Sequence, residues 1–246
     1  MQQPSITCKN CNYHFNGKFC NNCGQNAHVG PISFKEIVHE IWHNLTHTDK
    51  GYLQLFWYLL IKPGQTIRNY LNGRRKSYFS PLTFYLVTTS LLIVCTNPVF
   101  EKEDEIYHLN NEFAYYIGKS LNFILFFSIP IISILLYLFF RKQFRNLAEA
   151  VVTSIFAFGG LNFFLLLGCG FFYIFIGLHN EYKGIWTLLG YAFMFYILFD
   201  FLRPRRFLEI IKIGLLSIFF YFFVEMFAKG LFLMWYGVPF SKLDFF

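Results

Sequence analysis

Residues 150–178 read AVVTSIFAFGGLNFFLLLGCGFFYIFIGL and contain no formally charged side chain. A helix needs about 20 apolar residues to cross a bilayer, because every backbone N–H and C=O must there be paired within the segment. The run is long enough to span with tilt, or with a bend near its glycines. We therefore interpret it as a membrane-spanning helix.

The composition of the whole chain agrees with lipid as the solvent. Of 246 residues, 14% are charged and 55% are hydrophobic. A soluble domain carries about 25% charged residues, so a single soluble globule is excluded. The aromatic content of 22% also excludes a disordered chain. Core helices of a large soluble protein are the alternative, but little polar sequence remains to enclose them.

Similar stretches with few charges recur on both sides of this run. They predict an all-α polytopic membrane protein, with a transmembrane domain over residues 80–246. Its five helices are expected at about 82–99, 120–140, 150–178, 184–202 and 213–236. Alternating loops then place 16 Lys and Arg on the N-terminal side and five on or toward the other. By the positive-inside rule the N-terminus is cytoplasmic and the C-terminus lies outside.

The fifth predicted span contains two charges, Glu225 and Lys229. An ionised carboxylate inside a bilayer costs roughly 2.5–3.5 kcal/mol or more. One interpretation is a proton or ion site that faces the helix bundle. The other is a self-neutralised pair, since Glu four residues before Lys is the favourable order on a helix.

Four cysteines near the N-terminus form two CxxC pairs separated by eight residues: Cys8, Cys11, Cys20 and Cys23. Two such pairs joined by a short β-hairpin close a tetrahedral four-sulfur site, which zinc accepts. Asn16-Gly17 supplies a two-residue turn for that hairpin. Gly24 permits the positive φ that turns backbone amides toward the sulfurs.

We therefore predict a zinc ribbon over residues 1–30. Two disulfides are the alternative, but a cytoplasmic location keeps thiols reduced. A closed four-sulfur site leaves no open coordination position, so the zinc is expected to be structural. The ribbon surface carries only Lys9 and Lys18 as cations, which favours a protein or headgroup partner and predicts no nucleic acid.

Residues 31–79 are predicted to form cytoplasmic or interfacial amphipathic helices. On the polar face of the first helix His39, His43 and His47 recur every four residues. Two histidines at this spacing can share a metal ion, with Glu36, Glu40 or Asp49 as an oxygen ligand, whereas the alternative is a solvated polar face. The later cluster Arg74-Arg75-Lys76 is expected to attract anionic lipid headgroups, at roughly 1 kcal/mol per basic residue.

Several of these motifs together resemble a known family. The two CxxC pairs ending in CGQ, then HNLTHTDKG at 43–51 and KPGQTIRNYLNGRRKSYFSPLTFYL at 62–86, are similar to the bacterial membrane-protein family of domain of unknown function 3667. The resemblance covers roughly residues 8–90. It implies an N-terminal zinc ribbon combined with several spans, hence a location in the bacterial inner membrane. It implies no activity and no catalytic residue.

The predicted function is that of an interaction, scaffold or sensor protein, because the one strong site is a closed metal site. Its expected partners are the lipid bilayer, anionic headgroups and a protein bound through the ribbon. No nucleophile elbow, phosphate loop, dinucleotide fingerprint or HExxH motif occurs in the chain.

Two alternatives stay open. The first is a membrane-embedded enzyme acting on a lipid or lipid-linked phosphate at the cytoplasmic interface. Its candidate acid/base groups or metal ligands are His43, His47 and Asp49, with Arg74 and Arg75 holding phosphate. The second is a transporter that uses Glu225.

Overall fold

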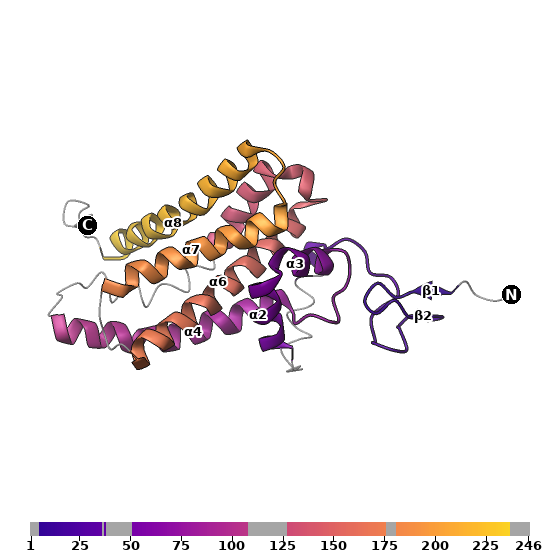
Figure 1. Ribbon diagram of the computed structural model, residues 1–246, viewed down its shortest axis with the longest axis horizontal. Helices are drawn as coiled ribbons and strands as arrows, with labels where there is room; N and C mark the ends of the chain where they lie inside the picture. The colour runs from indigo at the N-terminus through magenta and orange to yellow at the C-terminus, as the bar shows by residue number, and fades with distance from the viewer. Residues whose placement is uncertain (1–4, 36, 38–50, 108–126, 176–180, 237–246) are drawn as a thin grey trace.

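The computed structural model of the chain describes residues 5–35, 37, 51–107, 127–175 and 181–236. Its elements are β1 (Ile6–Thr7), β2 (His14–Phe15), α2 (Tyr52–Ile61), α3 (Pro63–Leu71), α4 (Pro81–Tyr107), the short 3-10 helix η1 (Arg141–Gln143), α6 (Leu147–Phe175), α7 (Glu181–Leu202) and α8 (Phe207–Tyr236). A further helical segment covers Phe127–Phe139. Figure 1 shows the two short strands at one end of the molecule and the long helices side by side at the other.

The long helices pack side by side in a row that contains α6. Helix α4 lies against α6, α6 against α7, and α7 against α8. The first half of α6 is almost wholly buried, with Phe156 and Phe158 fully inaccessible. Gly159 lies directly on the Phe84 ring of α4, where a Cβ would come within 2.7 Å of a ring carbon. This close approach brings the two helices together.

Helices α2 and α3 form a short corner over one end of this row. Pro63 ends α2 and begins α3, because proline lacks the N–H that would continue the first helix but fits the first turn of the next. Leu59 and Ile67 are fully buried in the same core as α6. The Tyr70 ring meets the Phe156 ring edge-on at 5.2 Å between centroids. The corner is therefore packed on the helical core.

The prediction of a five-helix transmembrane domain is wrong. Among the residues that the structure describes, one helical segment, Leu147–Gly168, is long and apolar enough to cross a membrane. Within its most apolar stretch 72% is buried inside the protein, and a core helix passes the same test. The remaining apolar helical stretches of the described part are 10–17 residues long: Tyr52–Ile61, Pro81–Cys95, Phe127–Phe139 and Leu188–Leu202.

The physical reason is that an uncharged stretch is not necessarily an apolar one. In the predicted first span, Thr88 and Thr89 are buried, and the Thr88 hydroxyl donates to the backbone carbonyls of Phe84 and Tyr85. Asn162 of α6 donates its amide to the Thr89 hydroxyl at 2.7 Å. Such polar side chains bond within their own helix, as Thr88 does, or across to a neighbouring helix, as Asn162 does. They lower the hydropathy of a segment without adding charge.

Candidate metal centre and the loop that holds it

The structure brings together the four cysteines that the sequence singles out. Their sulfur atoms all lie within 4.8 Å of one another. The Sγ atoms are 3.6 Å apart between Cys8 and Cys23, and 3.6 Å apart between Cys11 and Cys20. Tetrahedral metal–sulfur bonds of about 2.3 Å place sulfurs about 3.8 Å apart, whereas a disulfide needs about 2.05 Å. The four free thiols therefore fit a single bound metal ion.

The two cysteine pairs repeat one backbone design. The N–H of Cys8 donates to the Tyr13 carbonyl at 2.9 Å, and the N–H of Cys20 donates to the Gln25 carbonyl at 2.8 Å. In each pair the residue after the second cysteine has a left-handed backbone, with φ 59 at Asn12 and φ 71 at Gly24. Gly24 was predicted to do this. Asn12, at the equivalent position and of a type that tolerates this region, was missed.

The β-hairpin differs from the predicted one. Strands β1 and β2 pair antiparallel in the register Ile6 with Phe15 and Thr7 with His14, so the hairpin encloses the first cysteine pair. A separate bridge between Phe19 and Asn26 encloses the second. The chain therefore reverses direction twice, once around each cysteine pair. Asn16-Gly17 connects these two turns and does not form the tip of a single hairpin. The reason is that each pair already reverses the chain through its own amide–carbonyl bond five residues apart.

Local hydrogen bonding prepares part of the cluster for metal. The backbone N–H of Tyr13 lowers the pKa of the Cys11 thiol to about 6, which favours the thiolate that binds metals. Burial raises the pKa of the Cys23 thiol to about 11. The positive charge of a bound cation would offset that second effect, because it stabilises a neighbouring thiolate.

Two buried amide side chains fasten the cysteine ribbon to residues 72–77, which lie in the connection between α3 and α4 and are called the docking loop below. Gln25 is 5% exposed, and its Nε2 donates to the Gly73 carbonyl at 2.9 Å. Its Oε1 accepts from the N–H groups of Arg75 and Lys76, both at 3.2 Å. Asn10 is 4% exposed, and its Oδ1 accepts from the Ser77 N–H at 3.0 Å. These backbone N–H and C=O groups of the docking loop thus find their hydrogen-bond partners on the ribbon.

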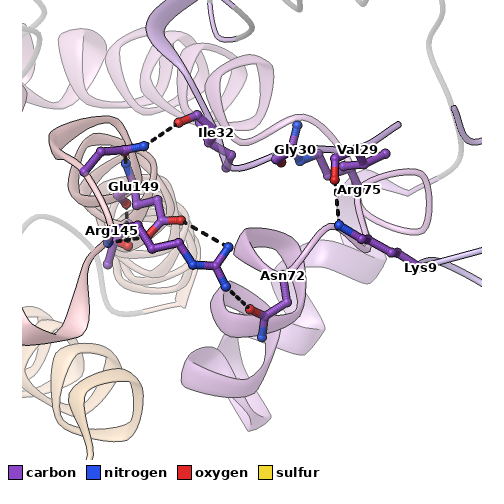
Figure 2. Close-up of polar contacts among 10 residues, drawn as sticks. Lys9, Val29, Gly30, Ile32, Asn72, Arg75, Arg145 and Glu149 are labelled. Carbon is purple, nitrogen blue, oxygen red and sulfur yellow. Dashed lines mark hydrogen bonds and ion pairs between the residues drawn. The ribbon is translucent and has the colours of Figure 1, made fainter. Parts of the chain in front are cut away.

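The chain that leaves the ribbon, residues 29–32, is tied down on both sides, as Figure 2 shows. Lys9 Nζ donates to the Val29 carbonyl at 2.7 Å, and Arg75 Nη2 donates to the Gly30 carbonyl at 2.7 Å. At the other end the Asn146 amide, at the start of α6, donates to the Ile32 carbonyl at 2.9 Å. The ribbon is therefore connected to the helical core through both the docking loop and α6.

The predicted lipid-contacting cations lie in this interface. Arg74 Nε donates to the Asn10 carbonyl at 3.2 Å, Arg75 bonds the Gly30 carbonyl, and the Lys76 side chain is exposed. Sequence reasoning missed Asn10 and Gln25. A signal was present for Gln25, because it ends the CGQ motif that carries the family resemblance.

The remaining predicted residues lie where the structure describes no side chains. His39, His43, His47 and Asp49 fall in residues 38–50, outside the described ranges. Glu225 and Lys229 lie within α8, but their side chains are outside the described part. Their proposed roles stay predictions.

The site and fold define a helical protein whose N-terminal four-cysteine module is docked on the loop between α3 and α4. Residues 49–93 match the family described as Protein of unknown function (DUF3667), which confirms the resemblance over that segment. The matched residues contain α2, α3, the docking loop and the first half of α4. No curated protein and no solved structure matches the chain.

Proposed function

We propose that the chain is a membrane-bound interaction protein of the bacterial inner membrane, with a structural zinc ribbon that presents a binding surface on the cytoplasmic side. One observation carries the interaction role. The ribbon uses Asn10 and Gln25 to hold the docking loop, while Tyr13 and Phe19 are 49% and 58% exposed. Exposed aromatic side chains on a rigid support are typical anchors of protein interfaces.

The closed sulfur cluster supports a structural role for the metal. Four thiolates fill a tetrahedral coordination sphere, so no position is left for water or substrate. Zinc is the metal we propose, because it accepts this geometry without redox chemistry. Free cysteines in the ribbon agree with the reducing cytoplasm.

Exposed apolar side chains on the helices support contact with lipid. On α8 five of them recur at the spacing of one helix face: Leu208, Ile211, Leu215, Ile218 and Phe219. The opposite face buries Ile213, Leu216 and Phe220. Exposing apolar surface to water costs about 25 cal/mol per Å², and large patches of this kind mark interaction or membrane surfaces. The segment Leu147–Gly168 is apolar enough to enter a bilayer as well.

A photo-crosslinking amino acid at position 19 tests the interaction role in intact cells, with the same probe at exposed Lys212 of α8 as the control. We expect a discrete protein adduct at position 19 that is absent at position 212 and is lost in the Cys20→Ser variant. Adducts with lipid alone, or turnover of a lipid-linked substrate by the purified protein, would contradict the proposal. Recovery of the chain in solution without detergent would contradict its membrane part.

A further inference from the structure

A cleft of about 600 Å³ lies where the corner between α2 and α3 meets the end of α7. Small-molecule sites occupy about 300–1,000 Å³, so its size is that of a binding site. Lys62, Arg68 and Arg203 line it together with a single carboxylate, Asp200. Among the residues that the structure describes, no acid besides Asp200 lines the cleft, so the cations there are in excess by three to one.

The carboxylate is already engaged by the protein. Asp200 Oδ2 accepts from the Gly64 N–H at 2.7 Å, and its Oδ1 lies 3.8 Å from Arg68 Nη2. Arg68 is fixed as well, because its Nη1 donates to the backbone carbonyls of Asp200 and Phe201 at 2.6 and 2.8 Å. Burial, followed by the charge of Arg203, lowers the pKa of the Arg68 guanidinium. Asp200 offsets the repulsion between the two guanidinium groups only in part, and an anion in the cleft would relieve what remains.

The other two cations are available to a ligand. Lys62 and Arg203 are exposed, and within the described part of the chain neither side chain forms a hydrogen bond or an ion pair with another residue. They reach the cleft from α2–α3 and from the end of α7, which are far apart in sequence. The fold therefore brings two hydrogen-bond donors, Lys62 and Arg203, to the same cleft.

The backbone at Arg203 is held in an unfavourable conformation. Its φ is 46, in the left-handed region, and Pro204 follows it. A side chain in this region costs roughly 1–2 kcal/mol, and glycine is the usual residue at such a helix end. An arginine held here, with its N–H donating to the Phe199 carbonyl at 2.9 Å, is the kind of strain that accompanies function.

We infer that the cleft binds a phosphate group, with Lys62 and Arg203 as its direct donors and Arg68 as a buried positive charge behind them. Lysine and arginine are the common phosphate ligands of proteins. The cleft is also lined by Tyr196 and Phe199, both 39% exposed. This mixture of cations and apolar surface suits the phosphate of an anionic lipid headgroup or a free phosphate. The inference does not rest on the interaction function proposed above.

The test uses the full-length protein purified in detergent and four variants. Lys62→Gln and Arg203→Gln each remove one cleft cation, whereas Arg206→Gln removes an equally exposed cation that does not line the cleft. Arg203→Lys restores the charge. Binding of inorganic phosphate is measured by calorimetry. Vesicles of phosphatidylcholine, with and without an equal part of phosphatidylglycerol, are mixed with the protein and the detergent is removed. Binding to the vesicles is then measured by flotation.

We expect Lys62→Gln and Arg203→Gln each to weaken binding about tenfold, the size of one lost charge-assisted hydrogen bond. Arg206→Gln should bind as the wild type does, and Arg203→Lys should recover most of the loss. A response in the phosphate arm alone identifies a free phosphate, and one in the vesicle arm alone identifies a headgroup. Equal binding by all variants, an equal loss in Arg206→Gln, or no saturable binding in either arm would overturn the inference.

Discussion

Asp200 accepts a hydrogen bond from the backbone N–H of Gly64, with 2.7 Å between Oδ2 and N, although the two residues are 136 positions apart in the sequence. Helix α3 has no side-chain cap of its own, since its N-cap residue is Lys62. Asp200 therefore caps α3 from the end of α7. In return Arg68 of α3 donates to the last carbonyls of α7. Each helix end satisfies backbone groups that the other leaves unpaired.

Replacing Asp200 separates its hydrogen bond from its charge. Asp200→Ala should lower the free energy of unfolding by about 1–3 kcal/mol, because it leaves the α3 terminus without an acceptor. Asp200→Asn should cost less, since it keeps an acceptor and loses only an ion pair at 3.8 Å between partly exposed groups. Denaturant unfolding in detergent measures both. Equal losses would show that the charge matters and the hydrogen bond does not.

Gly64 should tolerate no side chain, because a Cβ there would overlap the backbone carbonyl of Asp200. We expect Gly64→Ala to destabilise the fold by about 1–3 kcal/mol, the usual cost of overpacking. Gly214→Ala is the matched control. Gly214 lies within α8, and among the described residues its Cβ would meet only a Phe195 ring atom, at 4.0 Å.

The control substitution should be neutral or raise stability by about 0.5–1 kcal/mol, as glycine-to-alanine changes inside helices do. Thermal unfolding of both variants, monitored by circular dichroism, measures the difference in stability. A Gly64→Ala protein as stable as Gly214→Ala would mean that α3 and α7 do not approach as closely as described.

Local patterns predicted the cysteine cluster well. The two CxxC pairs together span 16 residues, so their spacing alone indicates a shared site. The positive φ of Gly24 follows from the same local geometry. The partners of the ribbon could not be read in this way. Gln25 bonds the Gly73 carbonyl 48 residues away, and nothing in a single sequence specifies which distant loop a buried amide will meet.

The helices were located more successfully than their surroundings. The predicted third span at residues 150–178 coincides closely with α6, Leu147–Phe175, because a long apolar run specifies a helix in either solvent. Whether that helix faces lipid or protein depends on which neighbours cover it. The burial of α6 under α4 and α7 results from tertiary packing, and charge-free stretches of sequence carry no information about which helices pack together.

Gln25 should be essential for docking the ribbon. Gln25→Ala removes one donor and one acceptor, and it leaves the Gly73 carbonyl and the N–H groups of Arg75 and Lys76 without those partners. We expect hydrogen exchange at these two amides to accelerate about ten- to hundredfold, as for a loss of about 1–3 kcal/mol. Gln54→Ala is the control, since Gln54 is exposed and bonds only the Tyr58 hydroxyl among described residues. Unchanged exchange in Gln25→Ala would show that the docking loop is ordered without the ribbon.

Metal removal should release the docking loop through the same contacts. For so small a module metal binding and folding are coupled. Asn10 lies inside the first cysteine pair, and the Gln25 carbonyl accepts from the Cys20 N–H of the second. Purified wild-type protein should contain one zinc ion per chain, and Cys20→Ser should contain none. Cys95→Ser, which changes an exposed cysteine of α4, should keep the full content.

On chelation, exchange at Arg75, Lys76 and Ser77 should rise to the level seen in Gln25→Ala, while amides of α6 stay protected because that helix is buried in the core. Mass spectrometry of the exchanged protein follows both regions in one sample. If the docking loop stayed protected after the metal had left, the ribbon would hold its shape without metal and the cluster would need another role. Because the α6 amides report on the core separately, such a result could not be mistaken for general unfolding.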